Sequence, residues 1–163
     1  MDRTSLIGTA QAIAVRSLLI VLLFVGYWTA WRPARTVVLN QVAVPVLQWS
    51  AEHENDVQAS AGPARLTLPS GQERGLPAPA GIPFLLPALF LVAAFPRKPY
   101  WFLFWVGHCA LFFLIVALWS GALMMWPGAE AVAGFMQTYG VDLYSIGVPV
   151  ALWMWERRRG SRT

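Results

Sequence analysis

The chain has 163 residues, of which 57% are hydrophobic and only 12% are charged, and its formal net charge is +4. A soluble domain of this length still exposes about a third of the surface of its unfolded chain and typically carries about 25% charged residues, so the composition excludes an ordinary soluble protein. The single cysteine excludes a disulfide scaffold, and the apolar composition disfavours a disordered chain.

Four apolar stretches predict four membrane spans. A helix needs roughly 17 to 25 residues to cross a hydrocarbon core of about 30 Å. The stretches lie at about residues 11–31, 81–95, 100–121 and 141–155. The second and the fourth are short and contain prolines, so we expect these two helices to kink or to pack inside the bundle. The sequence therefore predicts an all-α polytopic membrane protein with four transmembrane helices, all within one membrane domain.

The segment at 32–80 is the only sizeable piece between the spans, and we expect it to form a small extracytoplasmic cap between helices 1 and 2. Four apolar residues in its first half have the spacing of one helical face: Leu39, Val42, Val46 and Trp49. This amphipathic outer face predicts an interaction surface. The helix either lies on the outer membrane surface or packs on the tops of the spans.

Two further motifs follow in the same segment. The EHEND cluster at 52–56 brings carboxylates close to His53, but it has neither the alternating oxygen ligands of hard-cation loops nor the paired His or Cys of zinc sites. We therefore expect a solvated acidic loop and no metal site. The alternating ARLTLP at 64–69, followed by Ser70-Gly71, predicts a small β-hairpin. The apolar second outer loop, 122–140, is expected to lie at the membrane interface.

The distribution of basic residues predicts the orientation, because cytoplasmic segments retain Lys and Arg. A run of three arginines, Arg157, Arg158 and Arg159, ends the last span, and Arg97 and Lys98 lie between the second and third spans. Both termini are therefore predicted to be cytoplasmic. The arginine run is interpreted mainly as an orientation signal, and as an inner lipid-binding surface in the alternative.

His108 and Cys109 lie near the middle of the third span, where an ionisable residue is by default a functional candidate. Adjacent helix positions are rotated by about 100°, so the two side chains face different ways and do not form a nucleophile and its base. Cys109 is interpreted as a small core residue. His108 has two interpretations, a neutral imidazole bonded to a facing helix or a cofactor-binding, proton-handling residue. No catalytic residue and no bound cofactor are predicted.

The order of features also resembles a known group of proteins. An anchor ends at Trp31 and Pro33 and is followed by the amphipathic VVLNQVAVPVLQW and a short strand-like stretch. A proline-bearing GIPFLLPALFLVAAF and a final SIGVPVALWMW complete the pattern. This order resembles the small membrane proteins associated with exosortase systems, in particular the exosortase H-associated type. The resemblance implies an accessory factor in envelope protein sorting at the bacterial inner membrane, and it transfers no site residue.

Two functional hypotheses follow. The first is a non-enzymatic accessory subunit that lies in the lipid bilayer and binds a larger integral membrane protein. The alternative is a membrane enzyme or a redox or haem-associated component that uses His108 or Cys109. No nucleic-acid partner is expected, and a homo-oligomer stays open. Pairs of small residues four positions apart, Gly26 with Ala30 and Ala117 with Gly121, predict close helix contacts.

Overall fold

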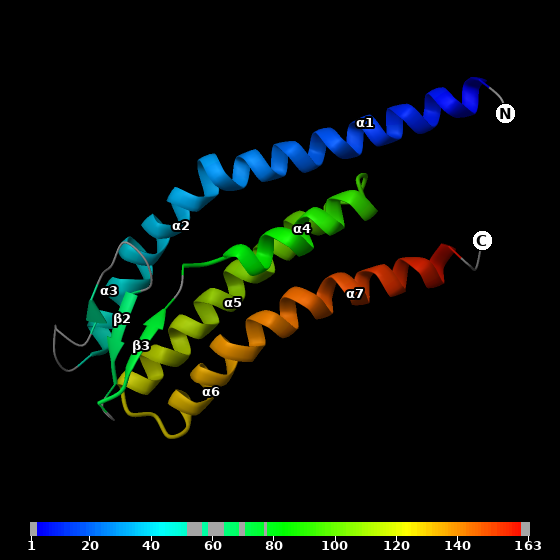
Figure 1. Cartoon of the computed structure of the whole chain (residues 1–163). Helices are drawn as coiled ribbons and strands as arrows, with labels where there is room; N and C mark the ends of the chain where they lie inside the picture. The colour runs from blue at the N-terminus through cyan, green and yellow to red at the C-terminus, as the bar shows by residue number, and fades with distance from the viewer. Residues whose placement is uncertain (1–2, 52–56, 59–63, 69–70, 77, 161–163) are drawn as a thin grey trace.

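The computed structural model describes residues 3–51, 57–58, 64–68, 71–76 and 78–160. The described part of the chain is predominantly helical, and its helices form four rods that run along one another (Figure 1). The first rod joins α1 (Arg3–Gly26), the π-helical η1 (Tyr27–Trp31), α2 (Arg32–Val38), the π-helical η2 (Leu39–Ala43) and α3 (Val44–Ser50). The second and third are α4 (Ile82–Ala94) and α5 (Tyr100–Leu123). The fourth joins α6 (Ala129–Phe135), the π-helical η4 (Met136–Gly140) and α7 (Val141–Gly160).

Helices form at all four predicted spans, and two of them are long and apolar enough to cross a membrane. These are the stretch Ala10–Ser50, with a mean hydropathy of 1.9 in its most apolar window, and Tyr100–Leu123, with 2.2. Ile82–Ala94 is a shorter apolar helix. Both prolines inside the predicted short spans, Pro87 and Pro149, lie within helices. The predicted helical architecture is thus confirmed at this level, and the crossing of a membrane by all four helices stays a prediction.

The first rod is longer than the sequence pattern predicted. The anchor was expected to end at Trp31 and Pro33, but Pro33 and Pro45 both lie within the rod, as the second residues of α2 and α3. Each follows a π-helical turn, whose wider winding shifts the backbone hydrogen bonds by one residue, as in the bond from the Arg32 N–H to the Tyr27 carbonyl. This shift immediately ahead of each proline relieves the crowding that would otherwise break the helix.

A three-stranded antiparallel sheet covers the end of the bundle that lies opposite the two termini. β1 (Val57–Gln58) pairs with β2 (Ala64–Thr67), and β2 pairs with β3 (Glu73–Leu76). The predicted hairpin is confirmed, because β2 and β3 pair around a turn in which Gly71 has a φ of +79° and its N–H donates to the Leu68 carbonyl. Such a φ favours glycine, which has no Cβ to clash.

The buried apolar residues form two clusters. The outer cluster joins the sheet to α3, α6 and the distal half of α5, and Leu47, Leu66 and Trp119 are at its centre. The inner cluster joins α4 to η1, α5 and α7 around Phe84, Ala88 and Phe104. The described residues of the predicted cap therefore show no core of their own. They share the outer cluster with α5, as expected for a segment too small to fold alone.

The two ends of the molecule differ. The sheet, α3 and the α5–α6 turn lie at one end, whereas the N-terminus, the C-terminus and the α4–α5 turn lie at the other (Figure 1). The segment 122–140, which was predicted to be the second outer loop, is largely helical, since α6 and η4 occupy most of it. Gly121 packs closely there, because a Cβ on it would lie 3.0 Å from the Trp126 ring and 3.5 Å from the Ala129 Cβ on α6. Ala117, which was predicted to share this close contact, is exposed.

Candidate functional site

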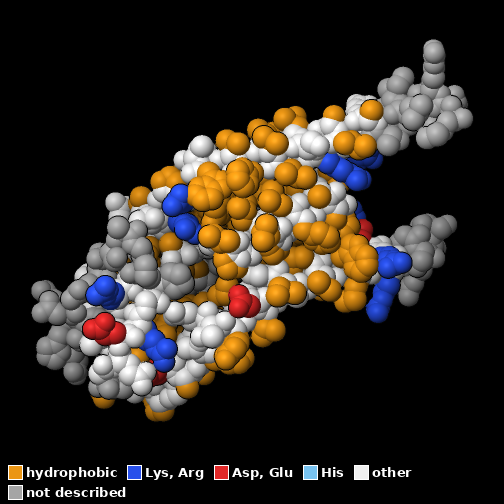
Figure 2. All heavy atoms as spheres, in the orientation of Figure 1, with side chains coloured by type: hydrophobic (Ala, Val, Ile, Leu, Met, Phe, Trp, Pro, Cys, Tyr) orange, Lys and Arg blue, Asp and Glu red, His pale blue; other side chains and the backbone are white. Residues whose placement is uncertain are grey.

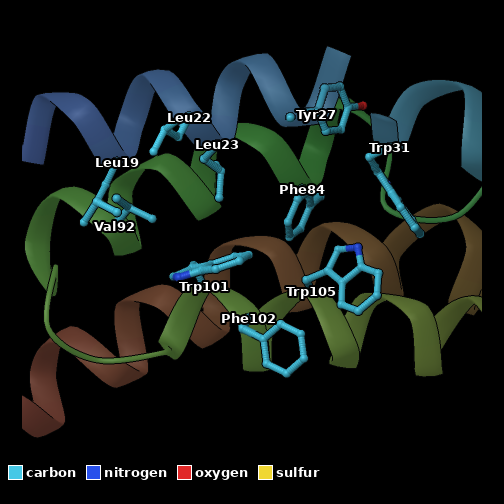
Figure 3. A pocket seen from close by; sticks show the side chains of 11 residues that line it. Leu19, Leu22, Leu23, Tyr27, Trp31, Phe84, Val92, Trp101, Phe102 and Trp105 are labelled. Carbon is cyan, nitrogen blue, oxygen red and sulfur yellow. The ribbon is translucent and has the colours of Figure 1, made fainter. Parts of the chain in front are cut away.

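An apolar groove lies between α1, α4 and α5. Its volume is about 500 Å³, which falls in the range of small-molecule sites, roughly 300 to 1,000 Å³. Leucine side chains from α1 and the Trp101 and Trp105 rings from α5 project into the space between these helices (Figure 3). We call this space the aromatic groove, and its lining residues are Leu19, Leu22, Leu23, Gly26, Tyr27, Trp31, Phe84, Val92, Trp101, Phe102 and Trp105.

The outer end of the aromatic groove is fixed by polar contacts of its aromatic side chains. The Trp31 indole N–H donates to the Ala80 carbonyl at 3.2 Å, and the Trp31 ring meets Trp105 edge-on with 5.0 Å between ring centroids. The Arg35 guanidinium donates to the Tyr27 hydroxyl at 3.2 Å. These contacts hold large rings at defined positions, as edge-to-face aromatic pairs and satisfied indole donors do.

The inner end of the same helices forms a second opening, which we call the basic cleft. It has a volume of about 640 Å³ and lies between the first half of α1 and the α4–α5 turn. Three basic side chains contribute to its lining, together with apolar and amide groups: Gln11, Ala12, Val15, Arg16, Phe95, Pro96, Arg97 and Lys98. Figure 2 shows hydrophobic side chains over the face of the molecule between its two ends, and Lys and Arg side chains toward both ends, including the end where the termini lie.

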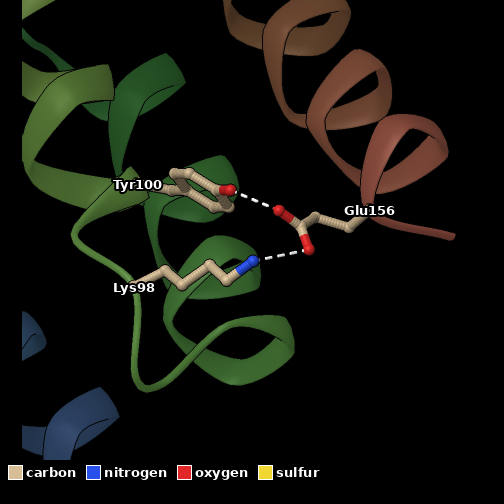
Figure 4. A network of polar contacts seen from close by, with 3 residues as sticks. All are labelled: Lys98, Tyr100 and Glu156. Atoms are coloured by element: carbon tan, nitrogen blue, oxygen red, sulfur yellow. Dashed lines mark hydrogen bonds and ion pairs between the residues drawn. The ribbon is translucent and has the colours of Figure 1, made fainter. Parts of the chain in front are cut away.

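One of the basic residues is held by a carboxylate. Lys98 Nζ lies 2.6 Å from a Glu156 carboxylate oxygen, and the Tyr100 hydroxyl donates to the other oxygen (Figure 4). The hydrogen bond from Lys98, and after it the one from Tyr100, holds the pKa of the Glu156 carboxyl below its usual range. The same bond raises the pKa of Lys98. This triad joins the end of α7 to the α4–α5 turn.

His108 lies in the inner part of the bundle, where its side chain is buried. Its Nε2 is 3.3 Å from the Ser145 hydroxyl on α7, and that hydroxyl donates to the Val141 carbonyl at 2.6 Å. Because the Ser145 proton is already used, the imidazole Nε2–H is the donor in the first bond. The arrangement matches the interpretation of an imidazole bonded to a facing helix. The cofactor-binding interpretation of His108 stays a prediction.

The surroundings of His108 are aromatic and tightly filled. The rings of Phe104, Tyr144 and Phe84 meet the imidazole edge-on, at centroid distances of 4.7, 5.0 and 5.4 Å. The cavity that His108 borders has a volume of about 110 Å³, well below that of usual small-molecule sites. Cys109 is partly exposed on a different face of α5, as the helical rotation predicted.

No metal centre is apparent in the described residues, where no group of three or more His, Cys, Asp and Glu side chains is arranged to hold a metal ion. The EHEND cluster at 52–56, including His53, lies outside the described residues. Its interpretation as a solvated acidic loop therefore stays a prediction.

The four residues of the predicted outer face separate in the structure. Leu39 is fully buried against the outer cluster, whereas Val42, Val46 and Trp49 are exposed, and Trp49 keeps 81% of its surface accessible. The predicted face assumed the winding of a regular α-helix between Leu39 and Val42. The π turn of η2 winds more widely and turns Val42 further from Leu39, so the buried face continues through Ala43 and Leu47.

The arginine run lies in the last turn of α7. Two of its guanidinium groups stack on tryptophans of the same helix: Arg157 lies 5.3 Å from the Trp153 ring centroid, and Arg159 lies 3.8 Å from that of Trp155. Such cation–π contacts keep the charges beside the rings that typically mark a membrane interface.

Sequence reasoning did not find the aromatic groove. Gly26 was expected to bring two helices into contact. In the structure a Cβ on Gly26 would meet nothing within 4 Å, so the predicted close contact is wrong at this position. The available signal was the series of aromatics at 101, 102 and 105 on one side of the third span.

Comparisons with protein-family models, with curated proteins and with solved structures gave no match to this chain. The geometry of its own residues is therefore the basis for any functional proposal.

Proposed function

We propose that this chain is a four-span protein of the bacterial inner membrane with both termini in the cytoplasm, and that it acts as an accessory subunit by binding a larger integral membrane protein. The two membrane-length helices support insertion into a bilayer. Both termini and the α4–α5 turn lie at the same end of the molecule, and this turn carries Arg97 and Lys98. This arrangement supports the proposed orientation, because cytoplasmic segments retain basic residues.

The proposal of a protein partner rests on the length of the first rod. Its apolar stretch Ala10–Ser50 has 41 residues, which correspond to roughly 60 Å of helix, about twice the thickness of the hydrocarbon core. A large part of the rod must therefore lie outside the hydrocarbon. Yet Val42, Val46 and Trp49 near its end stay exposed and apolar. Exposed apolar groups next to a membrane are typical of protein-interaction sites.

The setting that we propose is an envelope protein-sorting system. The resemblance of the element order to exosortase-associated membrane proteins supports this setting. An accessory role needs a stable docking surface and no reaction centre, and the exposed side of α2–α3 offers such a surface. The bound partner would have an apolar surface just outside its own spans.

Photo-crosslinking from the docking surface tests this proposal. A photoreactive phenylalanine replaces Trp49 in one variant and Leu18, an exposed residue of α1, in the other. We expect Trp49 to yield one reproducible adduct with a larger membrane protein in native membranes, and Leu18 to label mainly lipid. Mass spectrometry identifies the adduct.

Charge substitutions on the same rod provide the matched comparison. Val46→Asp with Trp49→Asp is expected to abolish co-purification of the crosslinked partner, because it places charges in the proposed contact. Gln41→Asp adds a charge at another exposed position of the rod and should leave co-purification intact. Equal retention of the partner by both variants would contradict the proposed surface.

A further inference from the structure

We propose that the aromatic groove and the basic cleft together form a binding site for one anionic glycerophospholipid of the inner leaflet. An acyl chain lies in the groove, and the phosphate lies between Arg16 and Arg97. This inference rests on the proposed insertion of the chain in the membrane, and it is independent of a protein partner.

The two openings follow each other along the same helices. Arg16 in the basic cleft precedes Leu19 in the aromatic groove by three residues, which is less than one turn of α1. On α4 the order is the same, since Val92 lines the groove and Phe95 lines the cleft three residues later. A single elongated ligand can therefore occupy both.

The dimensions match one leaflet of a bilayer. From Leu19 to Trp31 the groove extends over about 18 Å of helix, and half of a 30 Å hydrocarbon core is about 15 Å. The groove is almost entirely apolar, with aromatic rings at both of its ends. An acyl chain that starts at the level of Arg16 would thus extend along the groove to the region of Trp31.

The charges select an anionic headgroup. Within the described part of the chain, neither the Arg16 nor the Arg97 guanidinium takes part in a hydrogen bond or an ion pair, whereas Lys98 is paired with Glu156. No carboxylate contributes to the lining of the basic cleft. Two guanidinium groups with available donors suit a phosphate, which they bind in bidentate fashion.

A lipid accounts for both openings better than a protein segment does. A partner helix would fill the apolar groove but would leave the two guanidinium groups at its end without a matching anion. A phospholipid supplies the apolar chain and the phosphate in one molecule, at the spacing that the two openings provide.

Native mass spectrometry of the purified full-length protein in a neutral detergent tests the site. The probes are phosphatidylglycerol and phosphatidylcholine with identical acyl chains, and glycerol phosphate as the headgroup without chains. We expect wild-type protein to retain one phosphatidylglycerol in preference to phosphatidylcholine. We expect glycerol phosphate not to compete at equal concentration, because it lacks the chain that fills the groove.

Two variants separate the two halves of the site. Arg16→Gln with Arg97→Gln is expected to lower the affinity for phosphatidylglycerol roughly 25-fold, about 5-fold per guanidinium, and to remove the headgroup preference. Gly26→Leu fills the groove at a helical position where a Cβ meets nothing within 4 Å. This substitution should reduce retention of both lipids.

Matched controls exclude general effects. Arg157→Gln with Arg159→Gln removes the same charge at the same end of the molecule but outside the cleft. Gly147→Leu adds the same side chain to α7 at another open position. Both should bind phosphatidylglycerol as wild type does, and circular dichroism should show unchanged helicity in all four variants.

Three results would overturn the proposal. The first is equal affinity for the two lipids in wild-type protein. The second is an equal loss of affinity in the Arg157/Arg159 control, which would indicate surface charge alone. The third is a change of oligomeric state in Gly26→Leu without loss of lipid, which would indicate that a second copy of the chain occupies the groove. None of these depends on the crosslinking result for Trp49.

Discussion

Ser145 is the residue that orients His108, and it offers a direct test of the imidazole's role. Ser145→Ala removes the acceptor of the His108 Nε2–H and leaves that buried donor unsatisfied. We expect a loss of about 1 kcal/mol in the free energy of unfolding in detergent, in line with hydrogen bonds between membrane helices. The double variant with His108→Leu should lose less unfolding free energy than the sum of the losses in the two single variants.

The same pair of variants bears on the alternative function. A haem or redox role for His108 predicts a visible absorbance band in protein purified from native membranes, and loss of that band in His108→Leu. A structural role predicts that the Ser145 and His108 substitutions are energetically coupled in a double-mutant cycle, and that no absorbance band is present. Full additivity of the two substitutions would contradict the hydrogen bond.

Gly107 is a position where only glycine fits. A Cβ built on it would overlap the Tyr144 ring, and Tyr144 is held in place by stacking on Phe104 with 5.4 Å between centroids. Gly107→Ala is therefore expected to lower the free energy of unfolding by about 1–3 kcal/mol, the usual cost of overpacking. Thermal unfolding in detergent measures it.

The matched control for Gly107 lies on the facing helix. Gly147→Ala adds the same methyl group to α7 where nothing lies within 4 Å, so it should be neutral or stabilise the helix by up to about 1 kcal/mol through higher helix propensity. If both glycines tolerate alanine equally, the close contact between α5 and α7 at Gly107 is wrong.

At the scale of whole elements, the triad of Lys98, Tyr100 and Glu156 joins two rods, and its strength should depend on pH. The lowered pKa of Glu156 means that its contribution to stability is present above the ordinary carboxyl pKa of 4.5 and is lost as the pH falls through the lowered value. The raised pKa of Lys98 means that its contribution is present below 10.5 and is lost as the pH rises through the raised value.

The difference between wild type and Glu156→Gln measures this dependence. The thermal midpoint of wild type should exceed that of Glu156→Gln across the neutral range, and the difference should shrink at both pH extremes. Asp142→Asn removes the same charge at the opposite end of α7 and tests for a general charge effect. A difference that stays constant across the whole pH range would contradict the triad.

The elements show which parts of this fold the sequence pattern predicts well. Apolar length located all four helices, and alternation with a glycine turn located the β2–β3 hairpin. The continuity of the first rod was missed because Pro33 and Pro45 normally end a helix, and a π turn before each proline has no simple sequence signal. The split of Leu39 from Val42 has the same cause.

The candidate site was harder to predict than the helices. A groove depends on how far apart α1 and α5 lie, and that distance results from packing against α4 rather than from the composition of either helix. His108 was identified from the sequence because a polar residue in an apolar stretch is conspicuous. Trp101 and Trp105 were not, since tryptophan near a span end also marks an interface.

At the scale of the whole molecule, the proposed topology predicts which residues a membrane-impermeant reagent reaches. Cys109 is the only cysteine, so Cys109→Ser gives a background without thiols. In that background, Glu73→Cys in β3 should be labelled from outside in intact spheroplasts. Gly160→Cys at the end of α7 should be labelled only after the membrane is made permeable.

The labelling pattern separates the proposed topology from its alternatives. Labelling of Gly160→Cys in intact spheroplasts would contradict a cytoplasmic C-terminus. Labelling of both positions from outside would mean that the chain crosses the membrane an even number of times between Glu73 and Gly160, instead of the proposed three. At least one of the later spans would then not cross the membrane. Extraction by alkaline carbonate, as a control, should leave the protein in the membrane fraction.

The π turns of the first rod also affect how the chain tolerates changes in its length. Each is equivalent to an α-helical turn that holds one additional residue. Loss of one residue within Leu39–Ala43 would let the backbone return to regular winding, whereas loss of one residue within α1 would rotate everything beyond it by about 100°. Variation in length is therefore best accommodated at η1 and η2, close to the two prolines.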